Sequence, residues 1–122
     1  MRTPIIAGNW KMYKTAAEAR ALLEAMRQPL EAISSVERVL CPPFTALSTV
    51  SALVQGTHIG VGAQDLFWEK EGAYTGEVSP AMVKEFAQYV IIGHSERRQY
   101  FGETDETVNR KVKAALAHGL TP

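Results

Sequence analysis

The sequence predicts a single α/β domain with a parallel sheet, extending over residues 1–122. Short apolar runs of strand length alternate four times with longer stretches of helical period. Successive strand ends lie about 20 to 30 residues apart, which is the size of a βα unit. No linker-like composition separates one unit from the next. This alternation favours parallel strands joined by right-handed crossovers.

Four short apolar runs predict the strands. The second run is closed by Pro42-Pro43, the third contains glycine, and Gly93 ends the fourth. Each run is too short to be a helix and is followed by polar or turn-forming residues. In chain order, the predicted strands are Pro4–Gly8, Val36–Cys41, His58–Ala63 and Tyr89–Ile92.

The helices are predicted from apolar spacing together with their start and stop residues. Thr15, Ser79 and Thr104 are suited to cap helices through their hydroxyl groups. Pro29 is expected to end the first helix, and Gly119 the last. In chain order, the predicted helices are Ala16–Gln28, Thr45–Val54, a segment from Ser79-Pro80 carrying Met82, Val83 and Phe86, a short turn capped by Ser95, and Asp105–His118.

Composition excludes several classes of protein. Apolar residues make up 46% of the chain, which is too many for a disordered protein. Thirteen Lys and Arg balance thirteen Asp and Glu, so we expect neither a nucleic-acid nor a membrane partner. The first apolar run is too short for a signal peptide or a membrane span. A single cysteine, Cys41, fits a reducing compartment, so we expect a cytoplasmic protein.

Polar residues follow two of the predicted strands in a way that packing does not explain. Asn9-Trp-Lys11 follows the first strand, and His94-Ser-Glu96 follows the fourth. In a (β/α)8 barrel the active site lies at the carboxyl ends of the strands, and a whole barrel needs about 250 residues. Four units would therefore form half of such a barrel. We expect the first and fourth strands to lie side by side and to bring Asn9, Lys11 and His94 together.

Each of these segments also has a purely structural interpretation. Lys11 suits a phosphate or a developing oxyanion and Asn9 a carbonyl or hydroxyl, but a turn lysine is more often simply solvated. The ring of His94, placed before a helical turn, would face amide groups that disfavour its charged form. A neutral imidazole polarises a carbonyl; a structural histidine is the alternative.

The residues after His94 are expected to support it. Ser95 is most simply a helix cap, and Glu96 is either a buried partner of Lys11 or a surface acid. Arg97 and Arg98 are expected to hold the loop through ion pairs, for example with Glu103.

The segment from Gln64 to Glu77 is long for a compact connection, which is typical of functional or interacting loops. Its glycines allow a projecting tip, where Tyr74 and Thr75 supply contact area and a hydroxyl group. Docking into a partner and simple mobility are the two interpretations.

Taken together, these segments resemble the triosephosphate isomerase family along essentially the whole chain. Six ordered blocks carry the resemblance: Ala7-Gly-Asn-Trp-Lys-Met12, Cys41-Pro-Pro43, Gly62-Ala-Gln64, Gly72-Ala-Tyr-Thr-Gly-Glu-Val-Ser-Pro80, Ile92-Gly-His-Ser-Glu-Arg-Arg98 and Phe101-Gly-Glu-Thr-Asp-Glu106. The resemblance implies the first four βα units of a TIM barrel. It also implies interconversion of dihydroxyacetone phosphate and glyceraldehyde 3-phosphate, without cofactor or metal.

The resemblance also implies residue roles. Asn9 and Lys11 correspond to the substrate-binding pair, and Lys11 and His94 to catalytic groups; His94 would polarise the carbonyl and shuttle a proton. Ser95 and Glu96 correspond to supporting residues. The loop carrying Tyr74 and Thr75, within Gly72–Pro80, corresponds to the family's dimer loop and predicts a homodimer.

The family's catalytic glutamate, lid and phosphate loops belong to later strands, beyond Pro122. We therefore expect these 122 residues to be inactive alone and to need a chain that supplies the carboxyl-terminal half of the barrel. A non-catalytic half-barrel that folds or self-associates is the alternative. A different phosphate-binding (β/α) protein is disfavoured by the six blocks.

Overall fold

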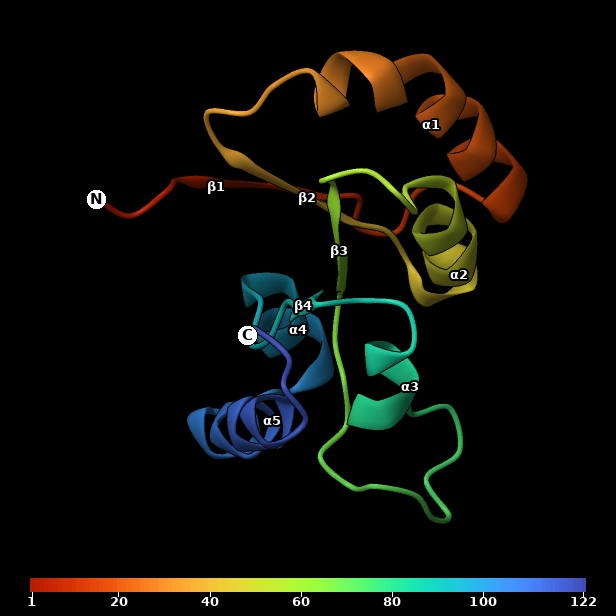
Figure 1. Cartoon of the computed structure of the whole chain (residues 1–122). Helices are drawn as coiled ribbons and strands as arrows, with labels where there is room; N and C mark the ends of the chain where they lie inside the picture. Colours follow the sequence, from red (N-terminus) through yellow and green to blue (C-terminus); the bar gives the residue numbers. More distant parts are fainter.

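A computed structural model describes all residues 1–122 and shows βα units in sequence, with a second helix after the fourth strand (Figure 1). The strands are β1 (Ile5–Asn9), β2 (Glu37–Cys41), β3 (Gly60–Ala63) and β4 (Tyr89–Val90). The helices are α1 (Ala16–Glu31), α2 (Phe44–Leu53), α3 (Pro80–Lys84), α4 (Ser95–Phe101) and α5 (Asp105–Ala117). None of these helices has both the length and the apolar character needed to cross a membrane.

The sheet is parallel throughout, with strand order β1-β2-β3-β4. Asn9 is in register with Cys41, and Ala63 with Val90, so the carboxyl ends of the strands lie at one edge. The expectation that the first and fourth strands lie side by side was wrong, because β2 and β3 separate them. The strand direction instead turns strongly between β1 and β3 (Figure 1), and this curvature brings the segments after β1 and β4 together.

The hydrophobic core lies between the sheet and its helices. Successive strand residues point to opposite faces, so Leu40, Val61 and Val90 face the helices while their neighbours face away. Leu23 of α1 and Val50 of α2 are fully buried against them. Figure 1 shows α1 and α2 near β1 and β2, whereas α3, α4 and α5 lie toward the other end of β3. The core thus holds together helices that come from all four units.

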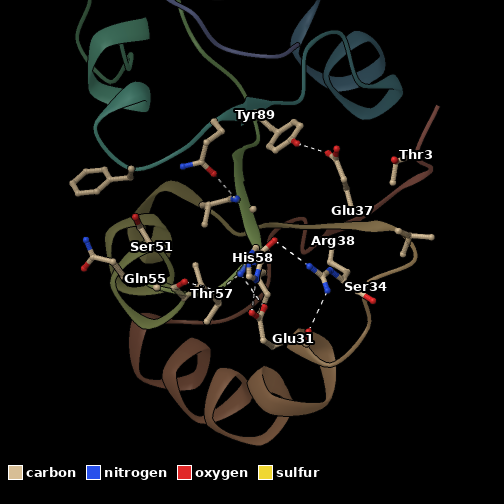
Figure 2. A pocket seen from close by; sticks show the side chains of 18 of the residues that line it. Thr3, Glu31, Ser34, Glu37, Arg38, Ser51, Gln55, Thr57, His58 and Tyr89 are labelled. Carbon is tan, nitrogen blue, oxygen red and sulfur yellow. Dashed lines mark hydrogen bonds and ion pairs between the residues drawn. The ribbon is translucent and has the colours of Figure 1, made fainter. Parts of the chain in front are cut away.

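On the opposite face of the sheet, β3 carries two glycines, Gly60 and Gly62. A Cβ atom at Gly60 would lie 3.0 Å from the ring of Tyr89, and one at Gly62 would lie 2.7 Å from Cys41 Sγ. The missing side chains allow Tyr89 of β4 to lie across β3 and donate a hydrogen bond to Glu37 Oε2 on β2, 2.6 Å away (Figure 2). This hydrogen bond, followed by burial, raises the pKa of Tyr89.

A pocket of about 820 Å³ opens at the amino ends of the strands (Figure 2). Thr3, Glu37, His58 and Tyr89 lie around it, as does Arg38, whose guanidinium donates to carbonyl groups of α1 and to the carbonyl of His58. It lies at the opposite end of the sheet from Asn9 and His94. The residues predicted to carry chemistry therefore do not line it.

Two expectations about helix ends were wrong. α1 does not stop before Pro29 but continues to Glu31 with the proline inside it. Only two helical residues follow Pro29, so the lost hydrogen bond and the bend that the ring imposes affect little of the helix beyond it. Ser95 is not the cap of α4: it is the first helical residue, and His94 occupies the cap position.

Other boundaries differ by a few residues. β4 covers two residues rather than four, and α3 ends before Phe86. The predicted caps Thr15 and Thr104 are confirmed, each within a reciprocal capping box. Thr121 forms a parallel bridge with Tyr89, on the edge of β4 away from β3. At the other edge, Ile5 and Ile6 of β1 are 50% and 62% exposed.

Candidate active site

Lys11 is held in an unusual backbone conformation just after β1. Its φ angle is 54°, in the left-handed region that non-glycine residues rarely adopt. Asn9 Oδ1 accepts the Lys11 N–H at 2.9 Å. Gln64, after β3, donates from Nε2 to the carbonyl oxygens of Lys11 and of Cys41, both at 2.9 Å. The strained turn is therefore fixed from both sides, which is typical of functional positions.

His94 lies after β4, between Gly93 (φ 68°) and the first turn of α4. Its Nδ1 atom accepts the backbone N–H of Glu96 at 3.1 Å. The ring proton is therefore carried by Nε2, which remains a donor. Glu96 Oε2 also lies 3.6 Å from Nδ1. Because Nδ1 already accepts an N–H, this contact is not an ion pair. One backbone amide of the helix, that of Glu96, thus contacts the ring as expected.

Lys11 and Glu96 join the two segments. Lys11 Nζ lies 2.7 Å from Glu96 Oε1, although two strands, β2 and β3, lie between β1 and β4. The hydrogen bond with Glu96 raises the pKa of Lys11, and the same bond lowers the pKa of Glu96. Both side chains are about half exposed, so Glu96 is a partner of Lys11 at the surface rather than a buried one.

Four charged side chains pair with one another next to this site, and we call them the charge cluster: Asp65, Arg97, Glu103 and Lys111. The expected Arg97–Glu103 ion pair is present at 2.5 Å. The sequence analysis did not predict that Asp65 and Lys111 would pair, although the position of Lys111 in its helix could have indicated a buried partner. Lys111 lies four residues before the buried Ala115, on the apolar face of α5, where a lysine requires a carboxylate partner.

The remaining predicted residues lie apart from Lys11 and His94. Tyr74 packs on Phe67, with ring centroids 4.7 Å apart, and is 43% exposed. Thr75 beside it is exposed. Figure 1 shows the loop between β3 and α3 projecting beyond α3. Gln64 was predicted only as part of a matching block, with no role; its two hydrogen bonds appear only in the fold.

The arrangement offers three donors at the carboxyl edge of the sheet. The Lys11 ammonium, the Asn9 amide and the Nε2–H of His94 follow strands whose carboxyl ends share an edge. Such donors suit a small molecule with oxygen atoms, one of them anionic. No group of three or more His, Cys, Asp or Glu side chains converges where a metal ion would bind.

Comparison with known proteins places the chain in a family. The sequence model described as triosephosphate isomerase matches residues 4–122. The triosephosphate isomerases of Chloroflexus aurantiacus and Thermoanaerobacter pseudethanolicus are each 59% identical over 123 aligned residues, covering 100% of this chain and 49% of each relative. The crystal structure of the Bartonella henselae triosephosphate isomerase superposes with a TM-score of 0.90 at 41% identity.

That superposition covers 98% of this chain and 49% of the Bartonella henselae chain. The chain thus spans about half the length of the curated relatives it matches. Its four parallel βα units correspond to the first half of a TIM barrel. Sequence and fold agree, and the chain belongs to the triosephosphate isomerase family.

Proposed function

We propose that this chain supplies the carbonyl-polarising part of a triosephosphate isomerase active site. The reaction interconverts dihydroxyacetone phosphate and glyceraldehyde 3-phosphate by proton transfer through an enediolate, without a cofactor. The observation that carries the proposal is the contact between Lys11 and Glu96, because it brings the segments after β1 and β4 to one point.

Three residues act on the substrate in this proposal. His94 donates from Nε2 to the carbonyl oxygen, since its Nδ1 is occupied by the Glu96 N–H. Lys11 stabilises negative charge on the phosphate and enediolate oxygens. Asn9 orients the substrate through its amide NH2 group, because its Oδ1 already accepts the Lys11 N–H. Ser95 and Glu96 hold the first turn of α4.

The general base is not among these residues. In the family it is a glutamate after the sixth strand, and none of the acids in residues 1–122 follows such a strand. A well-placed base typically contributes about 10²–10⁴-fold to the rate. We therefore expect negligible isomerase activity from the 122-residue chain alone. Activity should return when a chain carrying the second half of the barrel is added.

A coupled isomerase assay, with and without that second chain, tests the proposal. Lys11→Met and His94→Gln should each remove the recovered activity. Lys14→Met is the matched control, because Lys14 is an exposed lysine in the same turn and also has a positive φ angle. Full turnover from the 122-residue chain alone, or recovered activity in both variants, would contradict the proposal.

A second proposal is a non-catalytic module that self-associates. The exposed Ile5 and Ile6 at the edge of β1 favour it, since open edges and apolar surfaces promote association. Tyr74 and Thr75 would add a dimer contact through the Gly72–Pro80 loop. Size-exclusion chromatography is expected to show assemblies; a compact monomer would contradict this proposal while leaving the catalytic one intact.

The cellular role follows from the reaction. An enzyme that interconverts these triose phosphates acts in glycolysis and gluconeogenesis. A cytoplasmic location is consistent with the single cysteine, Cys41, which is buried and unpaired.

A further inference from the structure

The charge cluster connects four separate segments of the chain. Asp65 follows β3, Arg97 lies in α4, Glu103 lies between α4 and α5, and Lys111 lies in α5. Lys111 Nζ donates to Asp65 Oδ1 and to Glu103 Oε1, both at 2.8 Å. Arg97 Nε lies 2.5 Å from Glu103 Oε2 and 3.1 Å from Asp65 Oδ2. Two positive and two negative groups thus form a closed ring of ion pairs.

This ring is largely removed from solvent. The side chains of Lys111 and Glu103 are each 5% exposed, that of Asp65 10%, and that of Arg97 about a third. Burial by itself raises the pKa of Glu103, but hydrogen bonds from Lys111 and Arg97 outweigh burial and the pKa is lowered. The pairing therefore favours the charged form of Glu103, and the hydrogen bonds give the ring a directional, fixed geometry.

α4 is held by polar side-chain contacts rather than by apolar packing. The helix has seven residues and none of them is buried. Its last two side chains, Tyr100 and Phe101, are 68% and 66% exposed. Arg98 binds the Gly93 carbonyl just before the helix. Arg97 reaches Asp65, just after β3, and Glu103, which in turn binds Lys111 of α5.

From this we infer that the charge cluster is a positioning device: through Arg97, Asp65 and Glu103 hold α4 so that its cap, His94, and its second residue, Glu96, face Lys11. The meaning of this placement for catalysis rests on the proposed function. The placement itself is a property of the folded chain without substrate. Arg97 and Glu103 are positioning residues, since they act through α4 and do not reach the substrate donors.

The choice of variants follows from charge balance. Removing Arg97 alone leaves two buried carboxylates facing one lysine, and an uncompensated buried charge can unfold the domain. The double variant Arg97→Met/Glu103→Gln removes one charge of each sign and keeps the Lys111–Asp65 pair. It is expected to fold while α4 loses its link to the cluster. Arg97→Lys keeps the positive charge and tests rescue, and Lys113→Met is the control for loss of an exposed charge from α5.

The readout is the tautomer of the His94 ring, measured by ¹⁵N magic-angle-spinning NMR on the 122-residue chain, which does not require a monomer. His94→Gln assigns the signals. In the parent, Nδ1 should be unprotonated and Nε2 protonated. In the double variant, the ratio of this tautomer to the other should fall about five-fold, the equivalent of one net hydrogen bond. The single variant Arg97→Lys should show at most half of this fall in the tautomer ratio. Lys113→Met should have the same ratio as the parent.

Two results would overturn the inference. One is a folded double variant whose tautomer ratio equals that of the parent, since α4 would then be positioned by something else. The other is global unfolding of the charge-balanced double variant, seen as loss of protected amides in β2 and β3, since the cluster would then determine the fold as a whole. Because no turnover is measured, neither result depends on whether the proposed isomerase function is correct.

Discussion

Gly62→Ala tests how tightly β2 and β3 pack behind the candidate site. The Gly62 backbone has no positive φ, so alanine fits the conformation itself. Its Cβ, however, would lie 2.7 Å from Cys41 Sγ and 3.3 Å from Tyr89 Cβ, well inside van der Waals contact. Overpacking of this kind costs about 1–3 kcal/mol. Lower entropy of the unfolded chain returns about 0.4–1 kcal/mol.

The net expectation for Gly62→Ala is thus a loss of about 1–2 kcal/mol in the free energy of unfolding. Cys41→Ala in the same chain removes the sulfur that causes the clash. The double variant should therefore be less destabilised than the sum of the two single variants, by about 1 kcal/mol or more. Urea unfolding followed by circular dichroism measures all four chains, with an unchanged m value as the check on two-state behaviour.

Two outcomes would refute this reasoning. If the single effects add to within about 0.5 kcal/mol, the sulfur and the new methyl group do not compete for the same space. If Gly62→Ala is more stable than the parent, the two strands are further apart than the structure shows. Cys41→Ser serves as a control, because it keeps a γ atom in place of the sulfur and should rescue Gly62→Ala less well than Cys41→Ala.

Three further expectations concern charge and pH. Lys111→Met should lower the free energy of unfolding by about 3 kcal/mol, since it leaves buried carboxylates with one cation too few, whereas Lys113→Met should change it by less than about 0.5 kcal/mol; urea unfolding compares them. Burial raises the pKa of Cys41 to about 11, so its reaction with iodoacetamide in native protein should stay slow at pH 8 and become fast only on unfolding; a fast native reaction would refute this. The hydrogen bond with His58 lowers the pKa of Glu31, so the stability advantage over Glu31→Gln should be present above about pH 4.5 and disappear as the pH falls through the lowered pKa. An advantage that persists at pH 2 would contradict the assignment.

Sequence patterns predicted the element order because each element carries local information. The apolar run of β2 and the hydroxyl caps Thr15 and Thr104 depend on neighbours three or four residues away, and all three were confirmed. The end of α1 differs from the prediction because a proline disrupts the turn before it, whereas the two helical residues after Pro29 can still continue the helix.

The sequence supplied candidate site residues but not their geometry. Asn9, Lys11 and His94 could be proposed as candidates because strand ends are local features. That Lys11 meets Glu96 while β1 and β4 stay apart depends on the curvature of the whole sheet, which no short segment encodes. The two hydrogen bonds of Gln64 likewise span long stretches of sequence, since Lys11 is 53 positions and Cys41 is 23 positions before it.

The contact between Lys11 and Glu96 has a consequence for ligand selection. The ammonium is paired with a carboxylate 2.7 Å away, which offsets its attraction for passing anions. In the proposed function, a phosphate ester would compete with this carboxylate for the N–H groups of Nζ, and a dianion would compete more effectively than a monoanion of the same shape. The resting protein should thus bind chloride or acetate poorly, and removal of the carboxylate in Glu96→Gln should increase affinity for simple anions while reducing the preference for doubly charged ones.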